Sequence, residues 1–166
     1  GKCGLAESDD GLTWTAVEGG GEDGTILGPS EEADAWDHVH TGSVDVHEIL
    51  PARDGGEEGG YEMLYLGGSA EAVDLGGPGS QFGPLEGFRM RGGVARGSAD
   101  GKVWTKSPLN PVLDVGGGGG EEAENKQQKE WDSTFASWPR AVPLDPTDKE
   151  GQWLLTYHSL QPPNDA

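Results

Sequence analysis

Four short runs with apolar residues at alternating or consecutive positions occupy the middle of the chain. They cover residues 39–50, 61–66, 88–96 and 103–106. Alternation with a period of two, over runs of this length, is typical of β-strands. The one segment with helix-forming composition, residues 121–131, has no apolar stripe. The pattern therefore predicts an all-β chain.

The pattern of these runs occurs more than once along the sequence. Residues 4–15 resemble residues 93–105, residues 36–37 recur as 131–132, and residues 61–65 recur as 153–157. The three pairs are separated by 90, 95 and 92 residues. Three independent matches at nearly one spacing predict a structural repeat that contains four strands.

A turn motif, Ser-x-Asp-Gly-x-x-Trp, belongs to each copy of the repeat. It occupies residues 8–14 and 98–104. Glycine adopts the positive φ of a tight hairpin, and the aspartate side chain accepts hydrogen bonds from backbone N–H groups in the turn. The motif therefore predicts a hairpin whose tryptophan packs on neighbouring strands.

Composition alone gives a different picture, because the chain has 30 glycines, 11 prolines and a net charge of −19. Such values are typical of disordered chains. The six tryptophans, however, fall between or beside the glycine-rich tracts. We therefore expect ordered segments separated by flexible insertions, which we place at residues 18–35, 54–60, 67–83 and 116–130.

Charge and cysteine content exclude several classes of function. Eleven basic residues against 30 acidic ones argue against nucleic acid or an anionic membrane surface as a partner. The sequence has no apolar run long enough to predict a membrane span. The single cysteine, Cys3, excludes an internal disulfide and argues against a cysteine-based zinc site.

A four-stranded repeat with a turn-plus-tryptophan motif predicts the blade of a β-propeller. Residues 1–17 would be the last two strands of one blade, and residues 36–106 a complete blade with an insertion. Residues 131–160 would begin the next blade. Because a propeller needs roughly four or more blades to close, we expect the remaining blades to come from the rest of the polypeptide or from partners.

The turn motif, the sequence Pro-Val-Leu-Asp at residues 111–114 and the repeated Trp-Asp resemble the five-bladed β-propeller glycosidases. This is the arabinanase/levansucrase/invertase superfamily, which includes glycoside hydrolase families 32 and 43. The resemblance implies a five-bladed propeller, of which this chain represents about two blades. It also implies a carbohydrate substrate and hydrolysis of glycosidic bonds by inner-strand carboxylates, one of which protonates the leaving oxygen.

Positions that are the same in both units are interpreted as structural. They are Ser8/Ser98, Asp10/Asp100, Gly11/Gly101, Trp14/Trp104, Trp36/Trp131 and Asp37/Asp132. Inner-strand positions that differ between units are better functional candidates, and alternation places Ser43, Asp45 and His47 on one strand face. An unpaired carboxylate between valines is costly, so Asp45 requires a partner, such as an arginine, or a function. We take Asp45 as the candidate catalytic residue.

The other candidates are predicted to bind the substrate. Trp138 offers an apolar ring for a sugar face, and Arg140 a fork of donors for hydroxyls or a carboxylate. Ser43 and His47 would add polar contacts, while packing of Trp138 within a blade is the structural alternative. No metal site and no cofactor are predicted; a structural calcium ion in the propeller channel is the alternative.

Two other functions remain open at this point. A glycoside phosphorylase on the same fold would hold phosphate with Arg140 and a histidine. A catalytically inactive propeller would bind glycans or proteins without hydrolysis.

Overall fold

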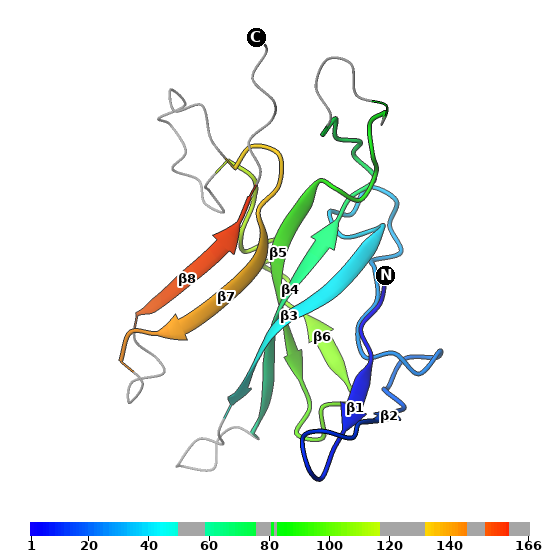
Figure 1. Ribbon diagram of the computed structural model, residues 1–166, viewed down its shortest axis with the longest axis vertical. Coiled ribbons are helices and arrows are strands. Elements are labelled where there is room, and N and C mark those ends of the chain that lie inside the picture. Colours follow the sequence, from blue (N-terminus) through cyan, green and yellow to red (C-terminus); the bar gives the residue numbers. More distant parts are fainter. Residues whose placement is uncertain (50–58, 76–80, 82, 117–131, 146–151, 160–166) are drawn as a thin grey trace.

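The structure is a computed structural model that describes residues 1–49, 59–75, 81, 83–116, 132–145 and 152–159. In this part of the chain there are antiparallel strands and no helix, which confirms the all-β prediction. Parts of the predicted insertions, at residues 54–58, 76–80 and 117–130, lie outside the described residues. The strands form three sheets (Figure 1).

The central sheet has four strands, each paired with the next in sequence. The strands are β3 (His40–Ile49), β4 (Gly60–Gly68), β5 (Met90–Gly97) and β6 (Trp104–Lys106). They all lie within the range of residues 36–106 that the repeat delimits. The simple order β3-β4-β5-β6 is the meander expected when consecutive strands are linked by hairpin connections.

Two smaller sheets contain two strands each. One consists of β1 (Leu5–Glu7) and β2 (Thr15–Val17), and the other of β7 (Ser137–Pro143) and β8 (Trp153–His158). In Figure 1 the pair β7–β8 lies on one side of the central sheet, and β1 and β2 lie near the opposite end by β6.

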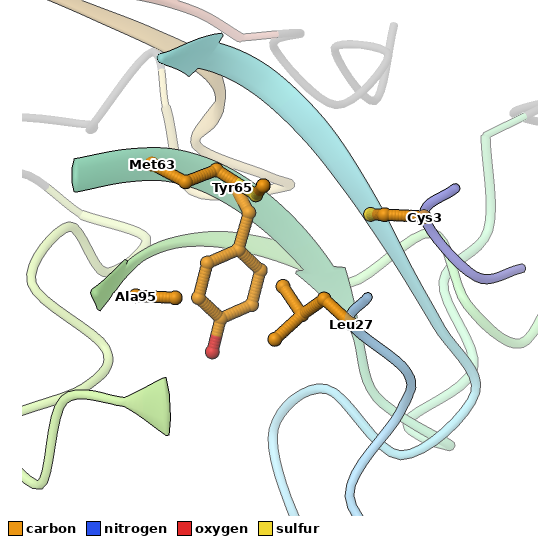
Figure 2. Close-up of a cluster of buried hydrophobic side chains, with 5 residues drawn as sticks. All are labelled: Cys3, Leu27, Met63, Tyr65 and Ala95. Carbon is orange, nitrogen blue, oxygen red and sulfur yellow. The ribbon is translucent and has the colours of Figure 1, made fainter. Parts of the chain in front are cut away.

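The two faces of the central sheet pack against different parts of the chain. On one face, Met63 and Tyr65 of β4 join Cys3, Leu27 and Ala95 in a buried cluster (Figure 2). The opposite face carries Leu66, which is paired with Gly92. A Cβ on Gly92 would lie 3.3 Å from Cγ of Pro139 in β7. The N-terminal segment and the β7–β8 sheet therefore cover opposite faces.

The repeat is visible in the strand registers. In β1–β2, Ala6 pairs with Ala16 and Glu7 with Thr15; in β5–β6, Ala95 pairs with Lys106 and Arg96 with Thr105. Outside the named strands, Cys3 forms an antiparallel bridge with Leu27, and Gly92 forms one with Leu113. The two hairpins and the segments that follow them thus share one hydrogen-bonding pattern.

The contact from one sheet to the next also recurs. The backbone N–H of Thr41 donates to the carbonyl of Gly1 at 3.0 Å, and that of Ala136 donates to the carbonyl of Met90 at 2.9 Å. Thr41 and Ala136 are equivalent by the spacing of 95 residues. Neighbouring sheets are therefore joined in the same way at both places.

Both turn motifs adopt the predicted hairpin, but the packing predicted for the tryptophan occurs in the second motif alone: Trp104 stacks on Tyr61 with ring centroids 6.4 Å apart, whereas Trp14 is 62% exposed. Gly11 and Gly101 have positive φ values of 72° and 69°. The Asp10 carboxylate accepts the backbone N–H groups of Leu12 and Thr13, and the Asp100 carboxylate accepts that of Lys102. A tight turn leaves some backbone N–H groups without a carbonyl partner, and the aspartate carboxylates accept hydrogen bonds from these groups instead.

The prediction of solvated insertions is wrong for parts of residues 18–35 and 67–83. Leu27 is 5% exposed and belongs to the buried cluster. Gly67 and Gly68 are the last residues of β4. A Cβ on Gly67 would lie 2.6 Å from the Trp36 ring, so this glycine allows the indole to approach the sheet. Composition does not distinguish a glycine required by packing from a glycine in a linker.

Candidate functional site

Asp45 and His47 lie on β3, on the face that is covered by the β7–β8 sheet. Their side chains are on the same face, as predicted, and Nε2 of His47 lies 3.4 Å from Oδ2 of Asp45. The two side chains are 27% and 28% exposed, respectively. The His47 ring meets the edge of Trp153 with 5.9 Å between centroids. Asp45 therefore has a histidine as its partner, not the arginine considered above.

Ser43 does not share this face, contrary to the prediction. Ser43 is paired with Tyr65, whereas Asp45 is paired with Leu64, because the register shifts between Ser43 and Asp45. Tyr65 and Leu64 are consecutive residues of a strand, so their side chains point to opposite faces. The extra residue of this β-bulge reverses the alternation, and Ser43 is turned away from Asp45 and His47.

Trp138 and Arg140 lie on β7, where the register is irregular between Ser137 and Arg140. Trp138 has a positive φ of 50° and packs edge-on against Phe135 and His158. Pro139 and Ala141 are buried while Arg140 is exposed, so Arg140 points away from the central sheet. The indole of Trp138 is 49% exposed.

The structure does not gather the predicted site residues into one site. Both inner strands have a bulge at the equivalent place, and Asp45 and Arg140 hold the same position in two successive sheets. Asp45 faces the gap between the sheets, and Arg140 faces outward from the second sheet. Equivalent positions in a repeat lie on successive sheets, so Asp45 lies on the central sheet and Arg140 on the β7–β8 sheet. The predicted site residues are therefore not brought together.

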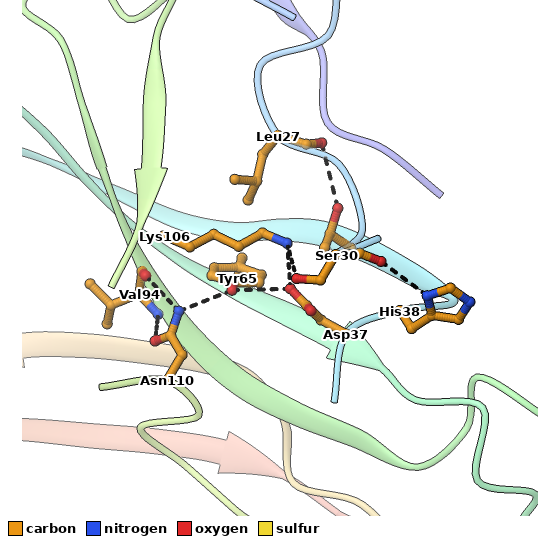
Figure 3. A network of polar contacts seen from close by, with 9 residues as sticks. Leu27, Ser30, Asp37, His38, Tyr65, Val94, Lys106 and Asn110 are labelled. Atoms are coloured by element: carbon orange, nitrogen blue, oxygen red, sulfur yellow. Dashed lines mark hydrogen bonds and ion pairs between the residues drawn. The ribbon is translucent and has the colours of Figure 1, made fainter. Parts of the chain in front are cut away.

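A buried polar network occupies the other face of the central sheet (Figure 3). Asp37 is 0% exposed, and its Oδ2 accepts the Lys106 ammonium at 2.6 Å and the Tyr65 hydroxyl at 3.3 Å. Lys106 also donates to Ser30, and Asn110 donates to the Tyr65 oxygen at 3.0 Å. Burial, followed by the negative charge of Asp37, raises the pKa of Tyr65 far above its ordinary value.

The same acid–phenol pair occurs in the next unit, where the Tyr157 hydroxyl donates to Asp132 at 2.6 Å. Burial and this hydrogen bond raise the pKa of Tyr157 to about 12. Recurrence at equivalent positions agrees with a structural role for Asp37 and Asp132. The pair anchors Asp37 onto β4 in the first unit and Asp132 onto β8 in the second.

A pocket of about 390 Å³ lies next to this network, at the end of the sheet where β3 begins. Its lining residues are Ala33, Asp34, Ala35, Trp36, Ser69, Ala70, Glu71, Arg91, Pro111 and Asp114. The volume is in the range of small-ligand pockets. The Ser69 side chain is buried, and its hydroxyl has no hydrogen-bond partner among the described residues.

Arg91 contacts two of the acidic side chains that line this pocket. Its Nε donates to Asp114 at 2.6 Å, and its Nη2 lies 3.7 Å from Glu71. The arginine side chain is 16% exposed, while Asp114 and Glu71 are 37% and 56% exposed. A mostly buried cation thus contacts two carboxylates at the pocket, and both carboxylates keep contact with solvent.

Sequence reasoning did not find this pocket, because its residues come from four separate segments. Glu71 lies in a tract for which composition predicts a flexible insertion, and Arg91 precedes the repeated segment of residues 93–105 and belongs to no motif itself. Two signals were present: Trp36, which recurs as Trp131, and the Pro-Val-Leu-Asp sequence that ends at Asp114. The repeat indicates a structural role for Trp36, and the Pro-Val-Leu-Asp sequence entered only as part of the family resemblance.

Among the described residues there is no helical segment with the length and hydropathy of a membrane span. Within the same residues, no group of three or more histidine, cysteine, aspartate or glutamate side chains is arranged to bind a metal ion. No family model, curated protein or solved structure matches the chain.

Proposed function

We propose that the chain forms part of a β-propeller and binds a saccharide in the pocket beside Trp36. Support for the propeller comes from the repeated contact between neighbouring sheets, in which Thr41 and Ala136 bond equivalent carbonyls. Stacked antiparallel sheets that follow one another by the same contact are the arrangement of propeller blades. Five blades remain what the sequence resemblance implies.

The composition of the pocket supports the saccharide. An indole and two carboxylates that contact Arg91 line one cavity: Trp36, Glu71 and Asp114. Sugars present apolar C–H faces and several hydroxyl groups, so they match an aromatic ring combined with hydrogen-bond acceptors. The observation that carries the proposal is that Trp36 lines one pocket together with Glu71 and Asp114, two carboxylates that contact Arg91.

Binding is tested by calorimetric titration with arabino-oligosaccharides and fructo-oligosaccharides, which suit the enzymes that the sequence resembles. We expect measurable binding that Glu71→Gln and Asp34→Asn weaken about tenfold, roughly the loss of one good hydrogen bond to a charged group. Glu32→Gln is the matched control, because Glu32 is exposed in the same loop as Asp34 and is absent from the pocket lining. Equal weakening by the control, or no binding of either sugar, would contradict the proposal.

Hydrolysis of a glycosidic bond is the second candidate, and the pairing of Asp45 with His47 favours it. A carboxylate beside an imidazole is able to act as a base or nucleophile. The test compares Asp45→Asn with Glu48→Gln, an exposed neighbour on the same strand. Loss of turnover in Asp45→Asn alone would support a catalytic role, and unchanged turnover would remove Asp45 from the mechanism. Saccharide binding without turnover in the unaltered protein would leave the first proposal intact.

A further inference from the structure

The charges of the side chains that line the pocket beside Trp36 do not balance. Asp34, Glu71 and Asp114 bring three carboxylates, and Arg91 is the one basic residue among the described residues of the lining. The rest of the lining is the indole, three alanines, a proline and a serine. A ligand in this pocket therefore meets an excess of negative charge beside an aromatic ring.

The positive charge at the pocket is already matched by two of the three carboxylates. Nε of Arg91 donates to Oδ1 of Asp114 at 2.6 Å, and its Nη2 lies 3.7 Å from Oε2 of Glu71. Arg89, which lies outside the lining, approaches the same oxygen of Glu71 with its Nε at 3.5 Å. Two guanidinium groups thus face Asp114 and Glu71, and neither is paired with the third carboxylate.

Asp34 is that third carboxylate. It is exposed, and none of the ion pairs among the described residues includes it. Its loop nevertheless has a defined backbone, because the N–H of Ala35 donates to the carbonyl of Glu32 at 3.0 Å and the N–H of His38 donates to the carbonyl of Ala35 at 3.2 Å. A carboxylate without a counter-charge is therefore presented to the pocket from a hydrogen-bonded turn.

The other two carboxylates are also carried by hydrogen-bonded backbone. Glu71 lies two residues before Val73, which forms an antiparallel bridge with Leu85. Asp114 directly follows Leu113, which forms a bridge to β5. The three acidic residues thus reach one pocket from three separate segments. A ligand that binds them does not have to order these segments first, which favours binding.

We propose that the saccharide held by this pocket is an amino sugar, whose protonated amine pairs with Asp34. The inference rests on the proposed function and adds the charge of the ligand. A hydrogen bond between an ammonium and a carboxylate is about twice as strong as one between neutral groups. An indole such as that of Trp36 also attracts a cation to its face. The net charge of −19 on the chain draws cationic ligands toward it.

An acidic sugar is the ligand that this arrangement disfavours. Its carboxylate would need a guanidinium group, and the Arg91 side chain is 16% exposed and already bonded to Asp114 at 2.6 Å. The acidic sugar would also lie close to Asp34 and Glu71, where like charges repel. A neutral sugar avoids this repulsion but leaves the charge of Asp34 without a partner. The order of affinity expected is therefore cationic, neutral, anionic.

The test is calorimetric titration of the whole chain with three probes at about pH 6, where an ordinary amine is protonated. The probes are deacetylated chito-oligosaccharide, its N-acetylated form and an oligogalacturonide. We expect the deacetylated form to bind at least tenfold more tightly than the N-acetylated form, and the oligogalacturonide to bind most weakly. Because the preference is electrostatic, it should decrease as the ionic strength rises.

A pair of variants assigns the preference to one carboxylate. Asp34→Asn should weaken binding of the deacetylated form at least tenfold more than binding of the N-acetylated form, since only the first has a charge to lose contact with. Glu32→Gln removes the same charge from an exposed residue of the same loop that is absent from the pocket lining. We expect this control to affect both ligands equally. Circular dichroism verifies that both variants fold.

The inference and the proposed function fail by different results. Equal affinity for the two chito-oligosaccharides, or a preference that Asp34→Asn leaves unchanged, would overturn the amino-sugar inference and leave saccharide binding intact. Absence of binding by every saccharide would contradict the proposed function itself. Choline is the last probe: if it binds as tightly as the deacetylated oligosaccharide, the pocket recognises a cation alone, and both proposals are overturned.

Discussion

The two aspartate–tyrosine pairs of this protein are equivalent in sequence and differ in their surroundings. Asp37 is 0% exposed and bonds both Tyr65 and the Lys106 ammonium. Asp132 is 3% exposed and accepts the Tyr157 hydroxyl at 2.6 Å. The first pair therefore contains a buried opposite charge, and the second contains a short hydrogen bond to a neutral group.

The origin of the cation explains the difference. Lys106 lies on β6, the fourth strand of the central sheet. The sheet of Asp132 has two strands in the described part of the chain, and in the β1–β2 hairpin the position of Lys106 is held by Ala16. Among the described residues, the acid–phenol pair thus occurs in both units, and the cation beside Asp37 comes from the fourth strand of the central sheet.

Removal of the aspartate charge gives the largest expected difference between the pairs. Asp37→Asn leaves the Lys106 ammonium, which is 25% exposed, without its counter-charge. We expect this variant to lose about 3 kcal/mol of unfolding free energy, as is usual when one member of a buried ion pair is removed. Asp132→Asn is expected to lose about 1 kcal/mol, the typical value for one hydrogen bond. Urea unfolding measures both.

A double variant sharpens this comparison. Asp37→Asn combined with Lys106→Met removes both charges and leaves an apolar side chain in place of the ammonium. We expect part of the lost stability to return, since the two substitutions share one interaction and are not additive. Equal losses for the two single aspartate variants, or a double variant that is less stable than Asp37→Asn, would show that the cation does not distinguish the pairs.

Alkaline pH should distinguish Tyr65 from Tyr157, with a smaller effect on stability than removal of the aspartate charge. Burial raises the pKa of Tyr65 well above its ordinary value, and the charge of Asp37 adds to this; the pKa of Tyr157 is raised to about 12 by burial and its bond to Asp132. Tyrosines of the unfolded chain ionise near pH 10. Stability from both residues is therefore intact below about pH 10 and is lost as the pH rises further.

The measurement is phenolate absorbance together with unfolding between neutral and alkaline pH. Tyr65→Phe should reduce the alkaline loss of stability more than Tyr157→Phe, because the burial of Tyr65 is greater. A larger reduction in Tyr157→Phe would reverse the ranking of the two pairs.

Local patterns in the sequence were sufficient to predict the strands and both turns. The Ser-x-Asp-Gly motif predicts its hairpin because the bonds run between residues two to five positions apart. The spacing of Trp36 and Trp131 likewise located the repeat. These features need no information about distant parts of the chain.

The site required information that the sequence does not carry locally. One β-bulge in β3 places Ser43 on the opposite face from the one predicted, and no residue type at that position indicates a bulge. The pocket beside Trp36 depends on four segments that meet only in the folded chain. Glycines such as Gly67 contributed to a disorder signature although their role is to admit an aromatic ring.

The two turn aspartates give the smallest effect and extend the comparison to the hairpins. The pKa of Asp10 is lowered to about 2, chiefly by the backbone N–H groups of Thr13 and Leu12 and then by the Ser8 hydroxyl. The pKa of Asp100 is lowered chiefly by the Ser98 hydroxyl and then by the N–H of Lys102. Depressed values mean stability that is present above the ordinary pKa, near 4, and lost as the pH falls.

Because the dominant bonds differ, one substitution should act unequally in the two turns. We expect Ser98→Ala to raise the pKa of Asp100 by more than Ser8→Ala raises that of Asp10, whose backbone bonds remain. Carboxyl chemical shifts followed by NMR through an acid titration measure both values in each variant. Equal increases in the two pKa values would mean that the serine contributes equally in both turns. The hydrogen bonds of the hairpins would then be the same in both sheets, unlike the surroundings of the aspartate–tyrosine pairs.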